Sequence, residues 1–135
     1  MEHCTEKTNN PLIVLEEKGK KMTFINRNRK VIRKIEVDGC AITDGIRCDW
    51  LVINDEDYEH FVELKGNDVV YACEQLRVSI TQLSTSPTQD AKHSFVIPSR
   101  VIPAINTKIQ NLKAIFKKRF NCTLIVKNQQ CSFEL

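Results

Sequence analysis

The hydrophobic pattern of the chain changes its period at Gly66, and this change limits the folds that the chain can adopt. Before Gly66, short runs rich in β-branched residues are separated by polar turns, which is typical of β-strands. After Gly66, apolar residues recur every three or four positions, which is typical of an amphipathic helix. These residues are Val69, Ala72, Cys73, Leu76, Ile80 and Leu83. The sequence therefore predicts a group of strands followed by a helix.

The strands before Gly66 are expected to form an antiparallel meander. Residues 46–53 and 59–65 predict two strands joined by the polar turn 54–58. A further hairpin is expected between 22–26 and 30–39, which are also rich in β-branched residues. We expect three neighbouring antiparallel strands to result.

Helices and strands alternate in the second half of the chain. Residues 67–83 predict a helix, 94–98 a buried strand, 105–121 a second helix and 122–127 a last strand. Such alternation after a meander favours an α/β fold with a mixed central β-sheet flanked by helices. Because 135 residues fit one domain of common size, we expect a single domain over 1–135.

The N-terminal segment and the cysteines give expectations about the cellular compartment of the protein. Residues 1–10 are polar and are expected to be loose, whereas 11–21 fits either a helical turn or a strand. No apolar run approaches membrane-spanning length, and the N-terminus lacks the order of a signal peptide. The six cysteines form no C-x-x-C pair, so we expect buried free thiols. These features predict a soluble protein of the reducing cytoplasm, with no membrane partner.

The register of the predicted hairpin brings two acids together. If the turn spans 54–58, Asp49 lies directly opposite Glu63, and Lys65 shares their face of the sheet. Opposed side chains in such a pair are close enough for two carboxylates to hold one divalent cation. A hard ion such as Mg²⁺ lowers the pKa of a bound water, and a lysine beside it stabilises charge on a phosphate under attack. These residue types suit the hydrolysis of a phosphodiester.

The arrangement resembles the PD-(D/E)xK nuclease superfamily, which includes restriction endonucleases, Holliday junction resolvases and RecB-like nucleases. Its active site has an acid on the second strand of a meander and (D/E)-x-K on the third, matched here by Asp49 in "IRCDWLVI" and by Glu63 and Lys65 in "FVELKG". A helix and a strand follow in the family, as predicted here. RecB-like members add a glutamine on that helix, which Gln75 matches.

The resemblance implies a restriction-endonuclease-like fold and a nuclease that depends on Mg²⁺ or Mn²⁺. Asp49 and Glu63 would be metal ligands, Lys65 would assist the reaction, and Gln75 would support them. Two features depart from the family pattern. Cys48 stands where many members have a proline, and the acid that many carry on an N-terminal helix has only Glu16 and Glu17 as candidates, in a segment whose structure the sequence leaves open.

Two groups of basic residues are candidates for binding nucleic acid, with DNA as the expected substrate. The first group comprises Arg27, Arg29, Lys30, Arg33 and Lys34, and the second, on helix 105–121, comprises Lys108, Lys113, Lys117, Lys118 and Arg119. No aromatic residues are interleaved with them, so they do not predict a platform for single strands. The net charge of +3 is too small to indicate a polyanionic partner by itself.

Other interpretations stay open. An E-x-K on a strand, a glutamine on a helix and basic helical residues are common on solvated surfaces. The chain is also compatible with a catalytically inactive subunit of the same fold that binds nucleic acid or protein. Its small size leaves little room for a specificity domain, so we expect a homodimer or a subunit of a larger complex. The family resemblance implies a role in prokaryotic antiviral defence or DNA processing.

Overall fold

The computed structural model describes residues 1–64, 67–101 and 103–135. Its largest element is a six-stranded mixed sheet with the strand order β1-β4-β5-β6-β7-β8. The strands are β1 (Thr5–Thr8), β4 (Ile32–Glu36), β5 (Trp50–Ile53), β6 (Glu59–Glu63), β7 (Lys92–Val96) and β8 (Cys122–Val126). The fold is therefore mixed α/β with a mixed sheet, as the sequence predicts.

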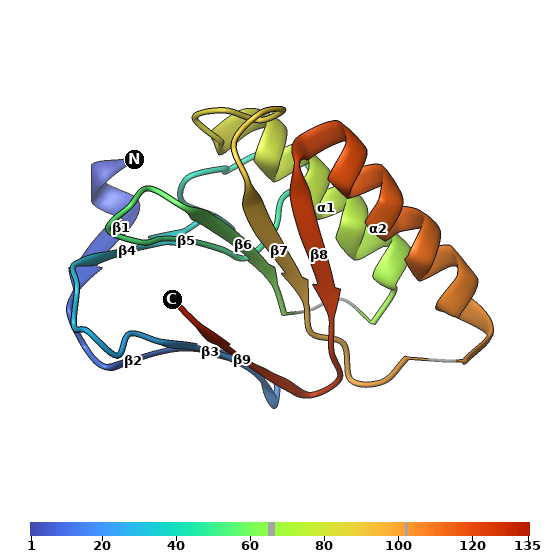
Figure 1. Ribbon diagram of the computed structural model, residues 1–135, viewed down its shortest axis with the longest axis horizontal. Coiled ribbons are helices and arrows are strands. Elements are labelled where there is room, and N and C mark those ends of the chain that lie inside the picture. The colour runs from blue at the N-terminus through green and yellow to red at the C-terminus, as the bar shows by residue number, and fades with distance from the viewer. Residues whose placement is uncertain (65–66, 102) are drawn as a thin grey trace.

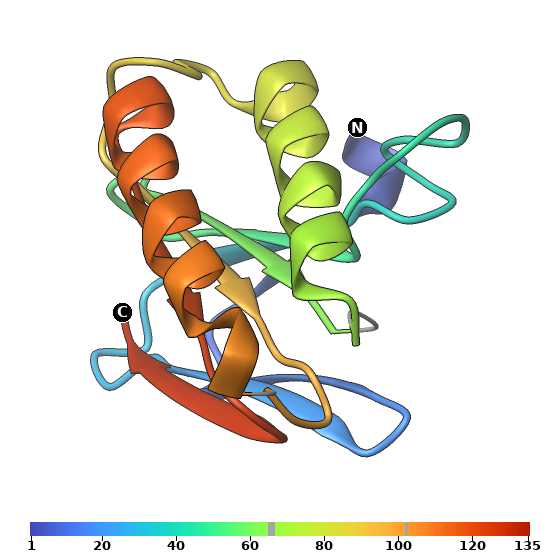
Figure 2. The ribbon, with the colours of Figure 1, turned by 90° about the vertical axis from the view of Figure 1, so that its right-hand side faces the viewer.

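Two helices cover one face of this large sheet, and a small sheet covers the other (Figures 1 and 2). The helices are α1 (Val69–Leu83) and α2 (Asn106–Phe120). The small sheet has the order β2-β3-β9 and consists of β2 (Leu12–Glu17), β3 (Lys20–Ile25) and β9 (Gln130–Glu134). Each face of the large sheet has its own buried apolar cluster, one with Leu51 and Phe61 under the helices, the other with Val52 and Phe95 against the small sheet. The large sheet is thus the middle of three layers.

The predicted meander is confirmed. Strands β4, β5 and β6 are consecutive antiparallel neighbours, and Leu51 pairs with Phe61 and Ile53 with Glu59, as the five-residue turn requires. Strands β6, β7 and β8 run parallel to one another, because α1 and α2 carry the chain back between them. The C-terminal ends of β6, β7 and β8 therefore lie at the same edge of the large sheet.

The predicted helices are also confirmed, within one or two residues at each end. Helix α1 begins where the Asp68 side chain accepts a hydrogen bond from the Tyr71 N–H at 3.1 Å, which satisfies one free donor of the first turn. Helix α2 ends at Asn121, whose left-handed conformation stops the helix. Among the described residues, no helix is long and apolar enough to cross a membrane.

The hairpin predicted between 22–26 and 30–39 is wrong. Strand β3 instead pairs with β2 through a tight turn at Lys18 and Gly19, both of which have positive φ. The loop after β3 then carries the chain from the small sheet to the large one. Asn26 shapes this loop, because its side chain accepts from the Lys30 N–H and donates to the Lys30 carbonyl. Residues 11–21, which the sequence left open, therefore supply a strand.

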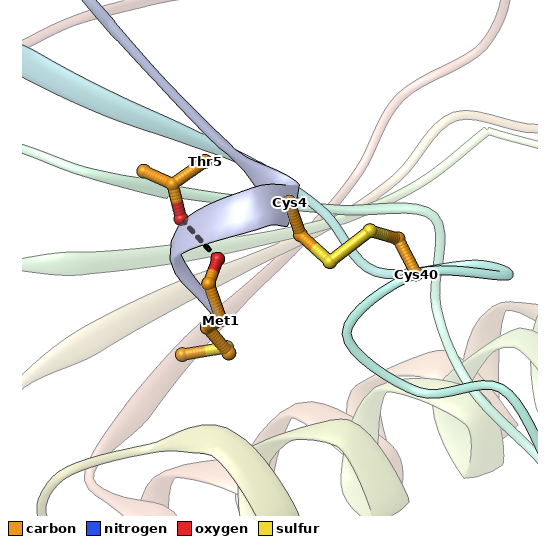
Figure 3. The surroundings of a disulfide bond; sticks show 4 residues. All are labelled: Met1, Cys4, Thr5 and Cys40. Atoms are coloured by element: carbon orange, nitrogen blue, oxygen red, sulfur yellow. Dashed lines mark hydrogen bonds between the residues drawn. A yellow bond between two sulfur atoms is a disulfide. The ribbon is translucent and has the colours of Figure 1, made fainter.

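The N-terminus and two cysteines also differ from expectation. Residues Glu2–Cys4 form a 3-10 turn and β1 pairs with β4, so this segment is ordered. Cys4 forms a disulfide with Cys40 in the loop after β4, with 5.7 Å between the Cα atoms (Figure 3). The prediction of six free thiols is therefore wrong for this pair. The other four cysteines are free and buried.

Two further elements were missed or misplaced. Strand β9 follows β8 and pairs parallel with β3, so 122–127 is not the last strand. Strand β5 begins at Trp50 rather than at residue 46, because the preceding segment forms a loop closed by the Arg47–Asp38 ion pair at 2.8 Å. Asp49 consequently lies at the junction between this loop and the strand.

Candidate functional site

A pocket of about 360 Å³ is lined by residues from both sheets. Its lining residues are Glu16, Glu17, Glu36, Asp38, Asp49 and Trp50. Five of these six carry a carboxylate. Asp49 is the buried one among them, with 4% of its surface exposed, whereas the others are half-buried or exposed. Asp49 therefore forms the inner wall of an acidic pocket.

Backbone hydrogen bonds fix Asp49 in this position. Its N–H donates to the Val62 carbonyl at 3.1 Å, and its own carbonyl accepts from the N–H groups of Val37 at 3.0 Å and Asp38 at 3.3 Å. Two consecutive residues of one strand thus oppose one residue of the next, which is the pattern of a β-bulge. Bulges redirect side chains and are frequent beside active sites. The Asp49 side chain is aimed by this local irregularity.

The Asp49 carboxylate also replaces part of the strand ladder. Its Oδ2 accepts the Leu64 N–H at 2.7 Å, while the regular β5–β6 pairing ends at Trp50 and Val62. Asp49 and Glu63, which were predicted to lie opposite each other, are thus the first residues beyond the regular β5–β6 pairing. The hydrogen bond to Leu64 ties the carboxylate to the chain segment that contains Glu63.

Glu63 ends strand β6 and is almost completely buried, with 1% of its surface exposed. Burial raises the pKa of the neighbouring Cys48 thiol to about 12, and the negative charges of Glu63 and Asp49 contribute to that rise. Both predicted acids therefore lie near one buried thiol. The structure brings Asp49 and Glu63 into the same neighbourhood.

Helix α1 holds the segment that leads into Asp49. The Gln75 Nε2 donates to the Arg47 carbonyl at 3.1 Å, and one turn later the Ser79 Oγ accepts the Cys48 N–H at 2.8 Å. Gln75 thus contacts the backbone two residues before Asp49, which is a positioning contact. Ser79 was not predicted, although a serine on the apolar stripe of a helix is a signal for a buried hydrogen bond.

Lys65, the third predicted active-site residue, lies outside the described residues. Lys20 of β3 is buried, and its ammonium donates to the Asn67 Oδ1 at 3.1 Å. This bond fastens the β2–β3 hairpin, which carries Glu16 and Glu17, to the chain that follows β6. The pocket wall from the small sheet is therefore attached to the candidate site.

Glu16 and Glu17 occupy the end of β2, opposite Lys21 and Lys20 respectively. They lie on a strand, and among the described residues no α-helix precedes the sheet to supply the acid found in many PD-(D/E)xK members. Both side chains nevertheless line the pocket that Asp49 lines. The small sheet supplies the additional carboxylates instead.

The predicted basic residues do not gather around the pocket. Arg27 pairs with Glu134 and Arg33 pairs with Asp57, each at 2.6 Å, and both ion pairs lie at strand ends remote from Glu36 and Asp49. Arg29 and Lys30 belong to the same β3–β4 loop as Arg27.

Helix α2 carries the second predicted group, Lys108, Lys113, Lys117, Lys118 and Arg119. Lys117, Lys118 and Arg119 occupy the last turn of the helix. This turn leads into the start of β8, at the end of the large sheet remote from Asp49.

Lys34 is the exception within the first predicted group. Its ammonium lies 5.0 Å from the centroid of the Trp50 ring, which lines the pocket.

The donors of the pocket fit a hard cation such as Mg²⁺ or Mn²⁺, because they are carboxylate oxygens. Mg²⁺ takes one or two carboxylates and keeps several waters, a demand that Asp49 and Glu63 satisfy in number. Among the described residues, the one cluster of three ligand atoms within 4.8 Å is His3, Cys4 and Cys40, and its two sulfur atoms are joined in the disulfide.

Glu36, Asp38 and Trp50 are pocket residues that the sequence did not indicate. Glu36 pairs with Trp50 across β4 and β5, so a correct register for β4 would have placed these two residues together, whereas Asp38 lies beyond this ladder. No protein-family model, curated protein or solved structure matches this chain.

Proposed function

We propose that this chain is a metal-dependent nuclease with a PD-(D/E)xK-like, restriction-endonuclease-like core. The observation that carries the proposal is the position of Asp49, which is buried, held by a β-bulge and placed between Glu63 and a pocket lined by further carboxylates. Carboxylates that line one pocket create a negative potential, which favours the binding of a cation. The order of meander, acid, acid-x-lysine, helix and strand supports the same function.

In this proposal, Asp49 and Glu63 hold Mg²⁺ or Mn²⁺, and Glu17 of β2, a half-buried residue of the pocket, is a candidate for a third carboxylate. When bound, the metal ion supplies hydroxide near neutral pH and polarises the scissile phosphate. The Leu64 N–H orients the Asp49 carboxylate, and Gln75 and Ser79 fix the backbone before it. Lys65 stabilises the charge that develops on the phosphate.

DNA is the proposed substrate, and a second copy or a partner protein is the proposed source of target selection. The basic residues of the β3–β4 loop and of α2 would contact phosphates away from the reacting bond. Because the β3–β4 loop and the last turn of α2 lie remote from Asp49, their basic residues would position the nucleic acid and not assist the chemistry.

The test is cleavage of labelled DNA and RNA, each single-stranded and duplex, by the purified chain. Mg²⁺ or Mn²⁺ should permit cleavage, a chelator should abolish it, and Lys65→Ala should reduce it strongly without lowering the melting temperature. Binding of nucleic acid without any cleavage, in either metal and by a well-folded preparation, would instead support the inactive binding subunit.

A further inference from the structure

Trp50 is the one tryptophan of the chain, and it lines the acidic pocket directly beside Asp49. The side chain is half-buried, so part of its surface remains accessible in the pocket wall. Among the described residues that line this pocket, five carry a carboxylate and attract cations, and Trp50 is the one with an aromatic side chain. An accessible indole beside a phosphate site is a surface on which a nucleobase can stack.

Lys34 occupies a place that a base could take. Glu36 lies opposite Trp50 in the sheet, and Lys34 lies two residues earlier on the same face, with its ammonium 5.0 Å from the ring centroid. An exposed cation–π contact is weaker than the stacking of a base on an aromatic ring. A base can therefore displace the ammonium, and the displaced ammonium remains close enough to contact a phosphate.

The distance along the chain links stacking to hydrolysis. Asp49 and Trp50 are consecutive residues, and both of them line the same pocket. A base on Trp50 and a phosphate at Asp49 therefore belong to the same nucleotide or to neighbouring ones. Inside a duplex both faces of each base are covered by its neighbours, so the ring can accept only an unpaired or terminal base.

We propose that Trp50 is a stacking platform for an unpaired base, and that the pocket acts on single-stranded or frayed nucleic acid. This inference rests on the proposed function, because it takes the pocket to receive nucleic acid. It adds the substrate class and assigns a specificity residue that the basic clusters do not provide.

Trp50 reports on its own environment, because no other tryptophan contributes to the fluorescence. The experiment titrates the full chain with a short single-stranded oligodeoxynucleotide, its duplex and the same strand with abasic sites, in Ca²⁺, which binds the same oxygen ligands as Mg²⁺. The single strand should quench the fluorescence and bind more tightly than the duplex. The abasic strand keeps the phosphates but should lose the quenching.

Variants then separate stacking from folding. By anisotropy of a labelled strand, Trp50→Leu should weaken binding about 5- to 150-fold, the equivalent of about 1–3 kcal/mol for one stacked base. Trp50→Phe keeps a ring and should retain most of the affinity. Tyr71→Leu is the matched control, because Tyr71 is an exposed aromatic residue on α1 that lines a different pocket.

Equal affinity for single strand, duplex and abasic strand would overturn the inference, as would a folded Trp50→Leu that binds like wild type. These results are distinguishable from failure of the proposed function. If the chain binds single strands through Trp50 but cleaves nothing in Mg²⁺, the stacking inference holds and the proposed nuclease function fails. If Trp50→Leu cleaves duplex and single strand equally well, the proposed nuclease function holds and the stacking inference fails.

Discussion

The two ends of strand β6 carry buried glutamates on the same face of the sheet, yet their surroundings differ. Glu59, at the hairpin end, accepts hydrogen bonds from the Ser84 hydroxyl at 2.5 Å and the Thr85 N–H at 2.9 Å. Glu63, at the pocket end, lies near Asp49, whose pocket is lined by four other acids. The two glutamates are almost equally buried, at 4% and 1% exposed.

At the hairpin end, the buried charged groups form hydrogen bonds with other groups of the protein. Lys92, which pairs with Glu59 across β6 and β7, donates to the carbonyls of Pro87, Asp90 and Phe120. Such a network is structural, because every group in it has a fixed partner. Burial of an acid is thus no sign of catalysis by itself. What distinguishes the pocket end is the convergence of several carboxylates on one hollow.

The largest difference between the two ends should be in activity. Asp49→Asn or Glu63→Gln should reduce metal-dependent cleavage roughly 1,000-fold, since each removes a proposed metal ligand worth several kcal/mol in the transition state. Initial rates on a labelled oligonucleotide would measure this loss. Glu59→Gln is the matched control, because it neutralises a buried acid of the same strand and should leave the rate unchanged. Equal losses in all three variants would contradict the distinction between the two ends.

The Cys4–Cys40 disulfide should contribute to the stability of the fold near the pocket end of the sheet. Cys4 and Cys40 are 36 residues apart, and a crosslink over such a loop stabilises a fold by about 3–4 kcal/mol in the chain-entropy treatment. Cys40→Ser, or reduction of the wild type, should lower the free energy of unfolding by that amount in urea titrations. Cys131→Ser, at a free cysteine, is the control. A wild type whose stability does not respond to reductant would show that the bond is dispensable.

The hairpin end should instead respond to acid. His60 is buried, and its ring stacks on that of His93 with 5.3 Å between the ring centroids. Its Nδ1–H donates to the Val52 carbonyl at 3.0 Å. Burial lowers the pKa of His60 to about 4 from an ordinary value of 6.5, so between these pH values the unfolded chain binds more protons. Stability from this residue is complete above pH 6.5 and is lost as the pH falls to 4, on the order of 3 kcal/mol.

Urea titrations from pH 7 to pH 4 would measure this loss. His60→Phe should flatten the curve, whereas His3→Ala, at an exposed position, should not. A wild type with the same stability at pH 7 and pH 4.5 would contradict the assignment.

The smallest effect is expected for Glu59 itself. Glu59→Gln retains the shape of the side chain but loses the charge in its bonds to Ser84 and Thr85, and should cost about 1–2 kcal/mol of stability. Thermal unfolding monitored by circular dichroism would detect it. If Glu59→Gln instead reduced cleavage at full stability, the hairpin end would also be part of the active site.

The sequence predicted the parts of the fold that depend on local patterns. The antiparallel β4–β5–β6 meander, the capped helix α1 and the stripe of α2 follow from alternation, turn length and helical spacing. The partners of β1 and β9 could not be found in this way, because these short strands pair with distant segments. The same holds for the disulfide, whose two cysteines have no diagnostic spacing.

The candidate site was predicted only in part, because local patterns indicate some of its residues and long-range contacts bring in the others. Asp49 and Glu63 follow from the length of one hairpin turn. Glu36 lies opposite Trp50 in the regular β4–β5 ladder, whereas Asp38 belongs to a bulge opposite Asp49 that no sequence pattern predicts. Glu16 and Glu17 depend on the packing of a second sheet, which long-range contacts determine.

The most direct test of the central claim is the anomalous scattering of Mn²⁺ soaked into crystals of this chain. The proposal predicts one strong peak at the acidic pocket, about 2.0–2.6 Å from carboxylate oxygens of both Asp49 and Glu63, and its disappearance in Asp49→Asn. Full-strength peaks only at exposed acids such as Asp55 or Glu56, with none at the pocket, would contradict a metal-dependent nuclease site.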